Sequence, residues 1–109
     1  MTKDELYNIS FQLILHSGNA RSSAMEAINE AKMENFDEAK RKITESDEEL
    51  ILAHKFQTKL IQGEARGERF DIPIILVHAQ DHLMTAITLK ELANEIIEVR
   101  QDMHHLTNN

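Results

Sequence analysis

Residues Asp71–His105 carry the pattern that decides the fold, and they read DIPIILVHAQDHLMTAITLKELANEIIEVRQDMHH. The spacing of apolar residues predicts one long helix that begins with Asp71 as its cap. Pro73 then lies in the first turn, where its missing N–H removes no hydrogen bond. Such a helix is about 50 Å long.

Two apolar stripes run along opposite sides of this predicted helix. One is centred on Asp81 and includes Ile74, Val77, Met84, Thr85, Thr88, Leu92, Ile96 and Val99. The other consists of Leu76, Ala79, Leu83, Ala86 and Ile97. A surface helix of a monomeric three-helix bundle needs one apolar face, and three helices cannot surround one another. The second stripe therefore favours oligomerisation over a helix buried deep in a larger bundle.

Two further helices are predicted before this one. The first runs from about Lys3 to Met33, and Ser17-Gly18-Asn19 is a place where it could bend or break. The second follows Asn35, a candidate N-cap with Glu38 in the capping-box position, and ends near Gly63. The charged, glycine-containing segment 62–71 is predicted to be a loop.

Composition limits the class of protein. A chain of 109 residues makes a single domain, 1–109, and its one Pro, three Gly and one Tyr are too few for a β-sandwich or barrel. The net charge of −7 argues against nucleic acid as a partner, and the absence of Cys excludes disulfides and thiolate chemistry. No apolar run is long enough to span a bilayer. We expect an all-α, antiparallel three-helix bundle in the cytoplasm.

The side chains that could react or bind a metal ion lie together in the third predicted helix. His78 and His82 are one helical turn apart, and Asp81 is three residues from His78. Three interpretations compete for the histidines. They are ligands of a metal ion, hydrogen-bonded residues without a further role, or a nucleophile, because neutral imidazole offers a lone pair at pH 7. Spacing alone does not choose between the last two.

Asp81 lies at the centre of an apolar stripe. A carboxylate in that place must be protonated, paired with a cation or bound to a metal, unless it reaches solvent at the edge of the stripe. If three copies met on a symmetry axis, their charges would repel one another unless a divalent cation lay between them.

Three segments resemble one protein family. They are HAQDHLMT (His78–Thr85), HSGNARS (His16–Ser22) and AHKFQTKLI (Ala53–Ile61). Together they are similar, in order and spacing, to the enzyme IIA of the lactose/cellobiose family of the bacterial phosphoenolpyruvate-dependent sugar phosphotransferase system. Ala79 favours the cellobiose/chitobiose/lichenan branch, because the lactose branch typically has Gly at this position.

The resemblance implies a phosphocarrier that assembles as a homotrimer of three-helix units. His78 matches the residue that accepts a phosphoryl group from a histidine of the phosphocarrier HPr and passes it to a cysteine of the cognate IIB component. Gln80 and His82 match neighbours of this acceptor. Asp81 matches the residue that three subunits share around a divalent metal ion, usually taken as Mg²⁺. The membrane IIC component would be an indirect partner, in the uptake of a β-glucoside disaccharide such as cellobiose or chitobiose.

Two alternatives come from other functional classes. One is a non-catalytic helical adaptor that trimerises through the third helix. The other is a histidine-phosphotransfer domain of two-component signalling, which also uses a histidine on a helix but exchanges its phosphoryl group with a kinase or a response regulator.

Overall fold

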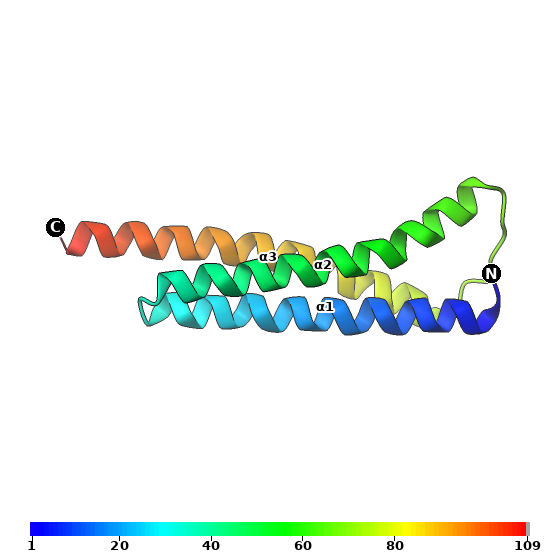
Figure 1. Ribbon diagram of the computed structural model, residues 1–109, viewed down its shortest axis with the longest axis horizontal. Coiled ribbons are helices and arrows are strands. Elements are labelled where there is room, and N and C mark those ends of the chain that lie inside the picture. Colours follow the sequence, from blue (N-terminus) through cyan, green and yellow to red (C-terminus); the bar gives the residue numbers. More distant parts are fainter. Residues whose placement is uncertain (109) are drawn as a thin grey trace.

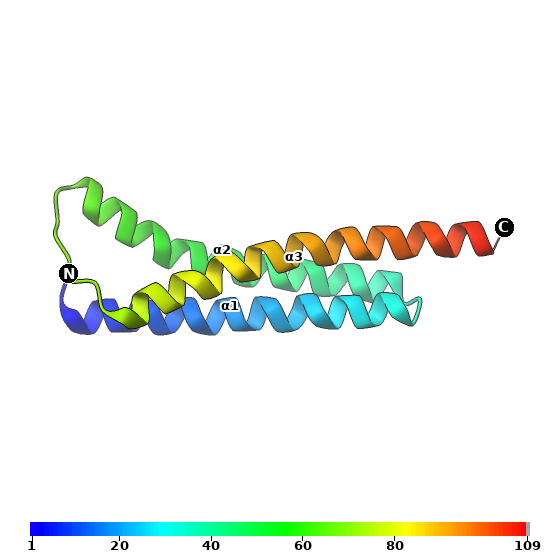
Figure 2. The ribbon, with the colours of Figure 1, turned by 180° about the vertical axis from the view of Figure 1, so that it is seen from behind.

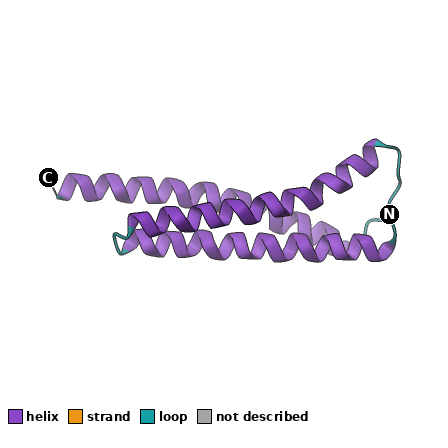
Figure 3. Ribbon diagram, viewed as in Figure 1, coloured by secondary structure: helices purple, strands orange, loops and turns teal. Residues whose placement is uncertain are grey.

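The computed structural model describes residues 1–108, which form three helices: α1 (Lys3–Lys32), α2 (Phe36–Ala65) and α3 (Ile74–Thr107). No strand occurs in this range (Figure 3). Successive helices run in opposite directions and form a rod of 60 × 20 × 18 Å (Figure 1). The prediction of an all-α, antiparallel three-helix bundle is confirmed.

The core lies along α1, which packs against both other helices, whereas α2 and α3 contact each other less. Alanines of α1, among them Ala20, Ala24 and Ala27, are fully buried and let the neighbouring helices approach closely. The inner stripe of α3 faces this core as predicted, since all five of its members are buried: Leu76, Ala79, Leu83, Ala86 and Ile97.

The starts of α2 and α3 differ from the prediction. Pro73 is the N-cap of α3 rather than a residue of its first turn, so α3 begins at Ile74 and not near Asp71. Asn35 is the N-cap of α2, but its side chain makes no capping hydrogen bond. It donates instead to Glu30, at 3.0 Å, while Glu38 accepts from Arg41. The expected capping box is therefore absent, because both side chains have other partners.

The two glycines expected to interrupt helices do not do so. α1 continues without a break through Gly18, and α2 extends past Gly63 to Ala65. A Cβ atom on Gly63 would lie only 2.8 Å from Cζ of Phe70. Gly63 thus provides room for the chain that returns toward α3, whereas Gly67, with a φ of 89°, makes the turn after α2.

The two ends of the rod differ. The C-terminal part of α2 diverges from the other helices, and residues 66–73 bridge the resulting separation to reach α3 (Figures 1 and 2). The start of α3 lies at this splayed end, and its last turns lie at the opposite end. None of the three helices is long and apolar enough to cross a membrane.

Candidate functional site

His78 lies in the second turn of α3 and is exposed to solvent. Because His82 is one turn further along the same helix, the two rings come together on its surface. Their Nε2 atoms are 3.0 Å apart, and the rings are perpendicular, with centroids 4.5 Å apart. The structure therefore unites the two histidines that the sequence singled out.

Gln80 connects this part of α3 to α2. Its side chain is half-buried, and its Oε1 accepts a hydrogen bond of 2.9 Å from Nε2 of Gln57. Gln57 was not among the predicted site residues, although it belongs to the Ala53–Ile61 segment that carried part of the resemblance. The bond joins α2 to the turn of α3 that presents His78.

Asp81 is exposed, and its carboxylate does not interact with His78 or His82. Its carboxylate makes no hydrogen bond or ion pair with any residue from 1 to 108. The side chains of Val77 and Met84, on the same side of α3, are 55% and 56% exposed. A carboxylate without a partner among exposed apolar side chains suits an oxygen-preferring divalent cation, but one carboxylate makes only part of a site.

No group of three His, Cys, Asp or Glu side chains in the described part of the chain could hold a metal ion. A metal site with three or more such protein ligands is therefore not present within residues 1–108. Asp81 fits a shared site only if other subunits supply further ligands.

A groove of about 230 Å³ lies between α2 and the start of α3, and Val77, the chain neighbour of His78, is among its lining residues. It is formed where α2 diverges from α3, and its lining is mostly apolar, including Leu60, Phe70, Ile72, Leu76 and Val77. Gln80 closes one side. The groove is thus largely apolar, although Glu64 adds one carboxylate to its lining.

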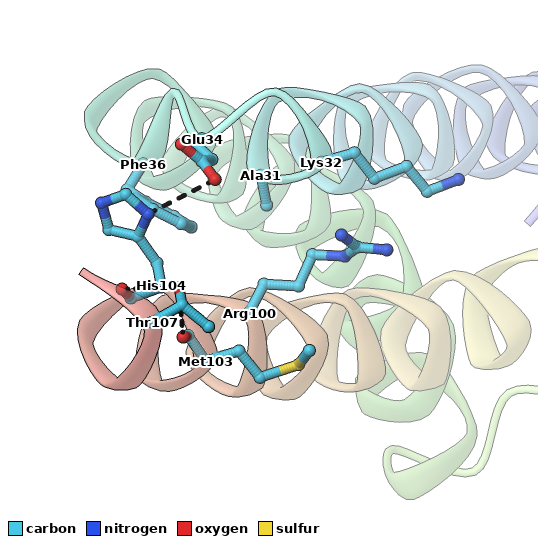
Figure 4. A pocket seen from close by; sticks show the side chains of 8 residues that line it. All are labelled: Ala31, Lys32, Glu34, Phe36, Arg100, Met103, His104 and Thr107. Atoms are coloured by element: carbon cyan, nitrogen blue, oxygen red, sulfur yellow. Dashed lines mark hydrogen bonds and ion pairs between the residues drawn. The ribbon is translucent and has the colours of Figure 1, made fainter.

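A second cavity, of about 140 Å³, lies between the turn joining α1 to α2 and the last turns of α3 (Figure 4). His104 contacts the ring of Phe36 there, and its Nδ1 is 3.4 Å from a carboxylate oxygen of Glu34. None of the predicted site residues lines this cavity, which is at the opposite end of the rod.

The resolved pKa shifts belong to the charged N-terminal part of α2. A hydrogen bond from Arg41 lowers the pKa of Glu38, and the same bond raises the pKa of Arg41. The pKa of Lys42 is raised by its contact with Glu26, at 2.7 Å. These groups stabilise the contacts within α2 and between α2 and α1, away from His78.

A family model and a known protein that match this chain point to the same family. The family model described as "PTS system, Lactose/Cellobiose specific IIA subunit" matches residues 8–101. The lichenan-specific phosphotransferase enzyme IIA component of Bacillus subtilis is 54% identical over 96 residues, which cover 88% of this chain and 87% of that protein. The matched range includes His78, Gln80, Asp81 and His82.

Solved structures that are similar to this chain belong to the same family. The crystal structure of the PTS cellobiose-specific enzyme IIA from Bacillus anthracis has a TM-score of 0.90 and 51% identity, covering 96% of this chain and 94% of that one. The Escherichia coli IIA(chitobiose), solved in solution in complex with HPr, has a TM-score of 0.79 and 40% identity, covering 91% and 96%.

Proposed function

Because the chain belongs to the lactose/cellobiose-specific IIA family of the phosphotransferase system, we propose that His78 is the residue on which it carries the phosphoryl group. The chain is a phosphotransferase component of the cellobiose/chitobiose/lichenan type. The observation that carries the assignment to His78 is its exposure in the second turn of α3, beside the apolar groove that Val77 and Gln80 help to form.

The chemistry needs little beyond position. A ring nitrogen of neutral His78 attacks the phosphorus of the donor phosphohistidine, a new N–P bond forms, and the donor's P–N bond breaks. The donor we propose is HPr, since the similar chitobiose-specific protein was solved as a complex with HPr. The second transfer reverses the roles, as a cysteine thiolate of a cognate IIB component attacks and the imidazole of His78 leaves.

Gln80 and His82 are the proposed neighbours of the acceptor. The bond from Gln57 fixes Gln80 against α2, which limits the motion of the turn that carries His78. His82 offers its Nε2 at hydrogen-bond distance from that of His78, so it restricts the orientation of the acceptor ring. Precise positioning is what an in-line transfer requires.

A homotrimer accounts for the outer face of α3. Apolar side chains along this face are exposed in the single chain over its whole length: Ile74, Val77, Met84, Leu92, Ile96, Val99, Met103 and Leu106. A stripe of this extent is typical of a helix that packs against further copies. Asp81 lies within it, and three Asp81 carboxylates would hold one divalent cation, Mg²⁺ by ligand type. The cation would supply positive charge that offsets their repulsion.

The transported sugar follows from the relatives rather than from the site. We propose a β-glucoside disaccharide such as cellobiose or chitobiose, taken up through a membrane IIC component that this chain serves only through IIB. The carrier would work in the cytoplasm, where phosphoenolpyruvate is available. It needs no sugar pocket of its own.

The assignment is tested by phosphorylation with enzyme I, HPr and labelled phosphoenolpyruvate. We expect the wild type to take up acid-labile, base-stable label, and His78→Ala to take up none while keeping its helical circular dichroism, because an exposed ring contributes little to folding. His54→Ala is the matched control, since His54 is also exposed, and it should label normally.

Normal labelling of His78→Ala would overturn the assignment. No labelling of the wild type would favour the adaptor. Labelling by a sensor kinase or a response regulator in place of HPr would favour the histidine-phosphotransfer domain.

A further inference from the structure

We infer that His78 and His82 form a bidentate site for a transition metal ion that prefers imidazole ligands, and that a bound ion stops His78 from accepting a phosphoryl group. The second half of this inference rests on the proposed function, whereas the first half does not. The site is separate from the oxygen site proposed at Asp81, because its ligands are nitrogen atoms.

The arrangement of histidines supports the site. The chain has six histidines, and His78 and His82 are the only two that are one helical turn apart. Two histidines at positions i and i+4 present their rings on one face of a helix, which is the spacing that helical zinc ligands use. His104 and His105, by contrast, are adjacent and point to different sides of α3.

The geometry of the two rings is compatible with chelation. The two Nε2 atoms face each other on the surface of α3 and are 3.0 Å apart. With metal–nitrogen distances of about 2.0–2.1 Å, this separation corresponds to an angle of about 95° at the metal. That angle is close to the one between neighbouring ligands in an octahedral or square-planar complex. Rotation of both rings about their Cβ–Cγ bonds is needed to direct the two lone pairs at the ion.

The proton balance is simple. In the hydrogen bond between the rings, one Nε2 carries a proton and donates the bond, and the other Nε2 accepts the bond with its lone pair. When the ion binds, this proton leaves Nε2 and the ring is protonated on Nδ1 instead, so both histidines stay neutral and both Nε2 lone pairs bind the metal. Water fills the remaining positions, because the described residues offer no third His, Cys, Asp or Glu.

The number of free lone pairs on the ring explains why a bound ion stops phosphorylation of His78. A neutral imidazole has one ring nitrogen with a free lone pair and one that carries a proton. Once the metal occupies Nε2 of His78 and the proton is on Nδ1, no lone pair remains to attack phosphorus. The block therefore holds whichever nitrogen receives the phosphoryl group, and it is relieved when the ion dissociates.

The first experiment measures binding of ZnCl₂ and NiSO₄ to the purified full chain by calorimetry, in excess Mg²⁺ to saturate oxygen ligands. We expect one ion per chain in the wild type, and binding weakened by at least about tenfold in His78→Ala and in His82→Ala. His54→Ala, which removes an exposed histidine without a partner one turn away, should bind as the wild type does. Equal binding by the wild type and His82→Ala would overturn the inference.

The second experiment measures the initial rate of phosphorylation with and without Zn²⁺. We expect Zn²⁺ to slow labelling of the wild type and a chelator to restore it. His82→Gln, which keeps a hydrogen-bonding group but is a poor metal ligand, should need at least about tenfold more Zn²⁺ for the same effect. It also controls for inhibition of the other components of the assay.

The experiments distinguish failure of the metal site from failure of the phosphocarrier assignment. If the wild type binds Zn²⁺ through both histidines but is never phosphorylated, the phosphocarrier assignment to His78 fails and the metal site stands. If labelling at His78 is normal and Zn²⁺ inhibits the wild type and His82→Gln equally, the inference fails and the phosphocarrier stands.

Discussion

His78 differs from His16, the histidine of the His16–Ser22 segment, in what its ring contacts. Nδ1 of His16 is 2.7 Å from a carboxylate oxygen of Glu49, and the ring stacks against Phe56. That histidine is held in place by a carboxylate partner across two helices. Among the described residues, His78 has only the ring of His82 as a hydrogen-bond partner, so no carboxylate holds its imidazole.

Ser17 and Ser46 permit a stability test at the scale of single atoms. Both side chains are fully buried, but Oγ of Ser46 donates to the carbonyl of Ala20 at 2.8 Å, whereas Oγ of Ser17 has no partner among the described residues. We expect Ser46→Ala to lower the free energy of unfolding by about 0.5–1.5 kcal/mol. Ser17→Ala should leave it unchanged or raise it. Urea denaturation measures both, and a larger loss in Ser17→Ala would contradict the assignment of hydrogen bonds.

Contacts within one helix could be predicted from the sequence, whereas contacts between helices could not. That His78 and His82 lie on one side of a helix follows from their spacing, because contacts within a helix depend on local geometry. Gln57 and Gln80 are 23 positions apart, and His16 and Glu49 are 33 apart. Such pairs depend on how two helices align along each other, which no local pattern specifies.

α3 is the element with two tasks, since its inner face folds the subunit and its outer face remains exposed. Leu92→Glu places a charge on the outer face, where Leu92 is 55% exposed. We expect this variant to stay helical but to sediment as a monomer, because the charge would be buried in the proposed assembly. Asn94→Glu, on the polar flank, is the control and should keep the mass of the wild type. Unchanged mass in Leu92→Glu would exclude this face from the interface.

The glycines give a second test at the scale of elements. Gly18 has no atom within 4 Å of the place that a Cβ would occupy, and it lies in the middle of α1. Gly18→Ala should therefore raise the free energy of unfolding by about 0.5–1 kcal/mol, because alanine restricts the unfolded chain. Gly63→Ala should lower the melting temperature, since Phe70 would have to move. A stabilised Gly63→Ala would show that this contact is loose.

The helix ends show why the element boundaries were only partly predictable. All three helices and the buried stripe of α3 follow from apolar periodicity. Gly63, however, is a helix breaker by propensity and yet stays within α2, where Phe70 of the following loop packs closely against it. The contact joins a helix to the loop that follows, so tertiary packing overrides local preference.

At the scale of the whole molecule, the proposed trimer brings three Asp81 carboxylates together. The wild type should sediment at about three times the 12.6 kDa of one chain. A chelator should lower its melting temperature, because the carboxylates then repel one another. Asp81→Leu removes the charge, so it should melt no lower than the wild type and be insensitive to the chelator, as replacement of buried ionic groups is often neutral or stabilising by about 1–4 kcal/mol.

Two outcomes would contradict this account of Asp81. A monomeric wild type would leave the outer stripe of α3 without an explanation. Loss of assembly in Asp81→Leu, with the helices intact, would mean that the carboxylate contributes attraction of its own rather than repulsion relieved by a cation.

The position of His78 on one small surface at the splayed end of the rod has a kinetic consequence. In the proposed relay, the donor and the recipient must both reach the imidazole of His78, so the two cannot be docked on one site at the same time. Each round of transport therefore includes a departure and a fresh encounter, and a docking contact that lasts too long delays every later step. Brief, modest-affinity complexes suit such a relay, and mutations that tighten either complex would reduce its throughput.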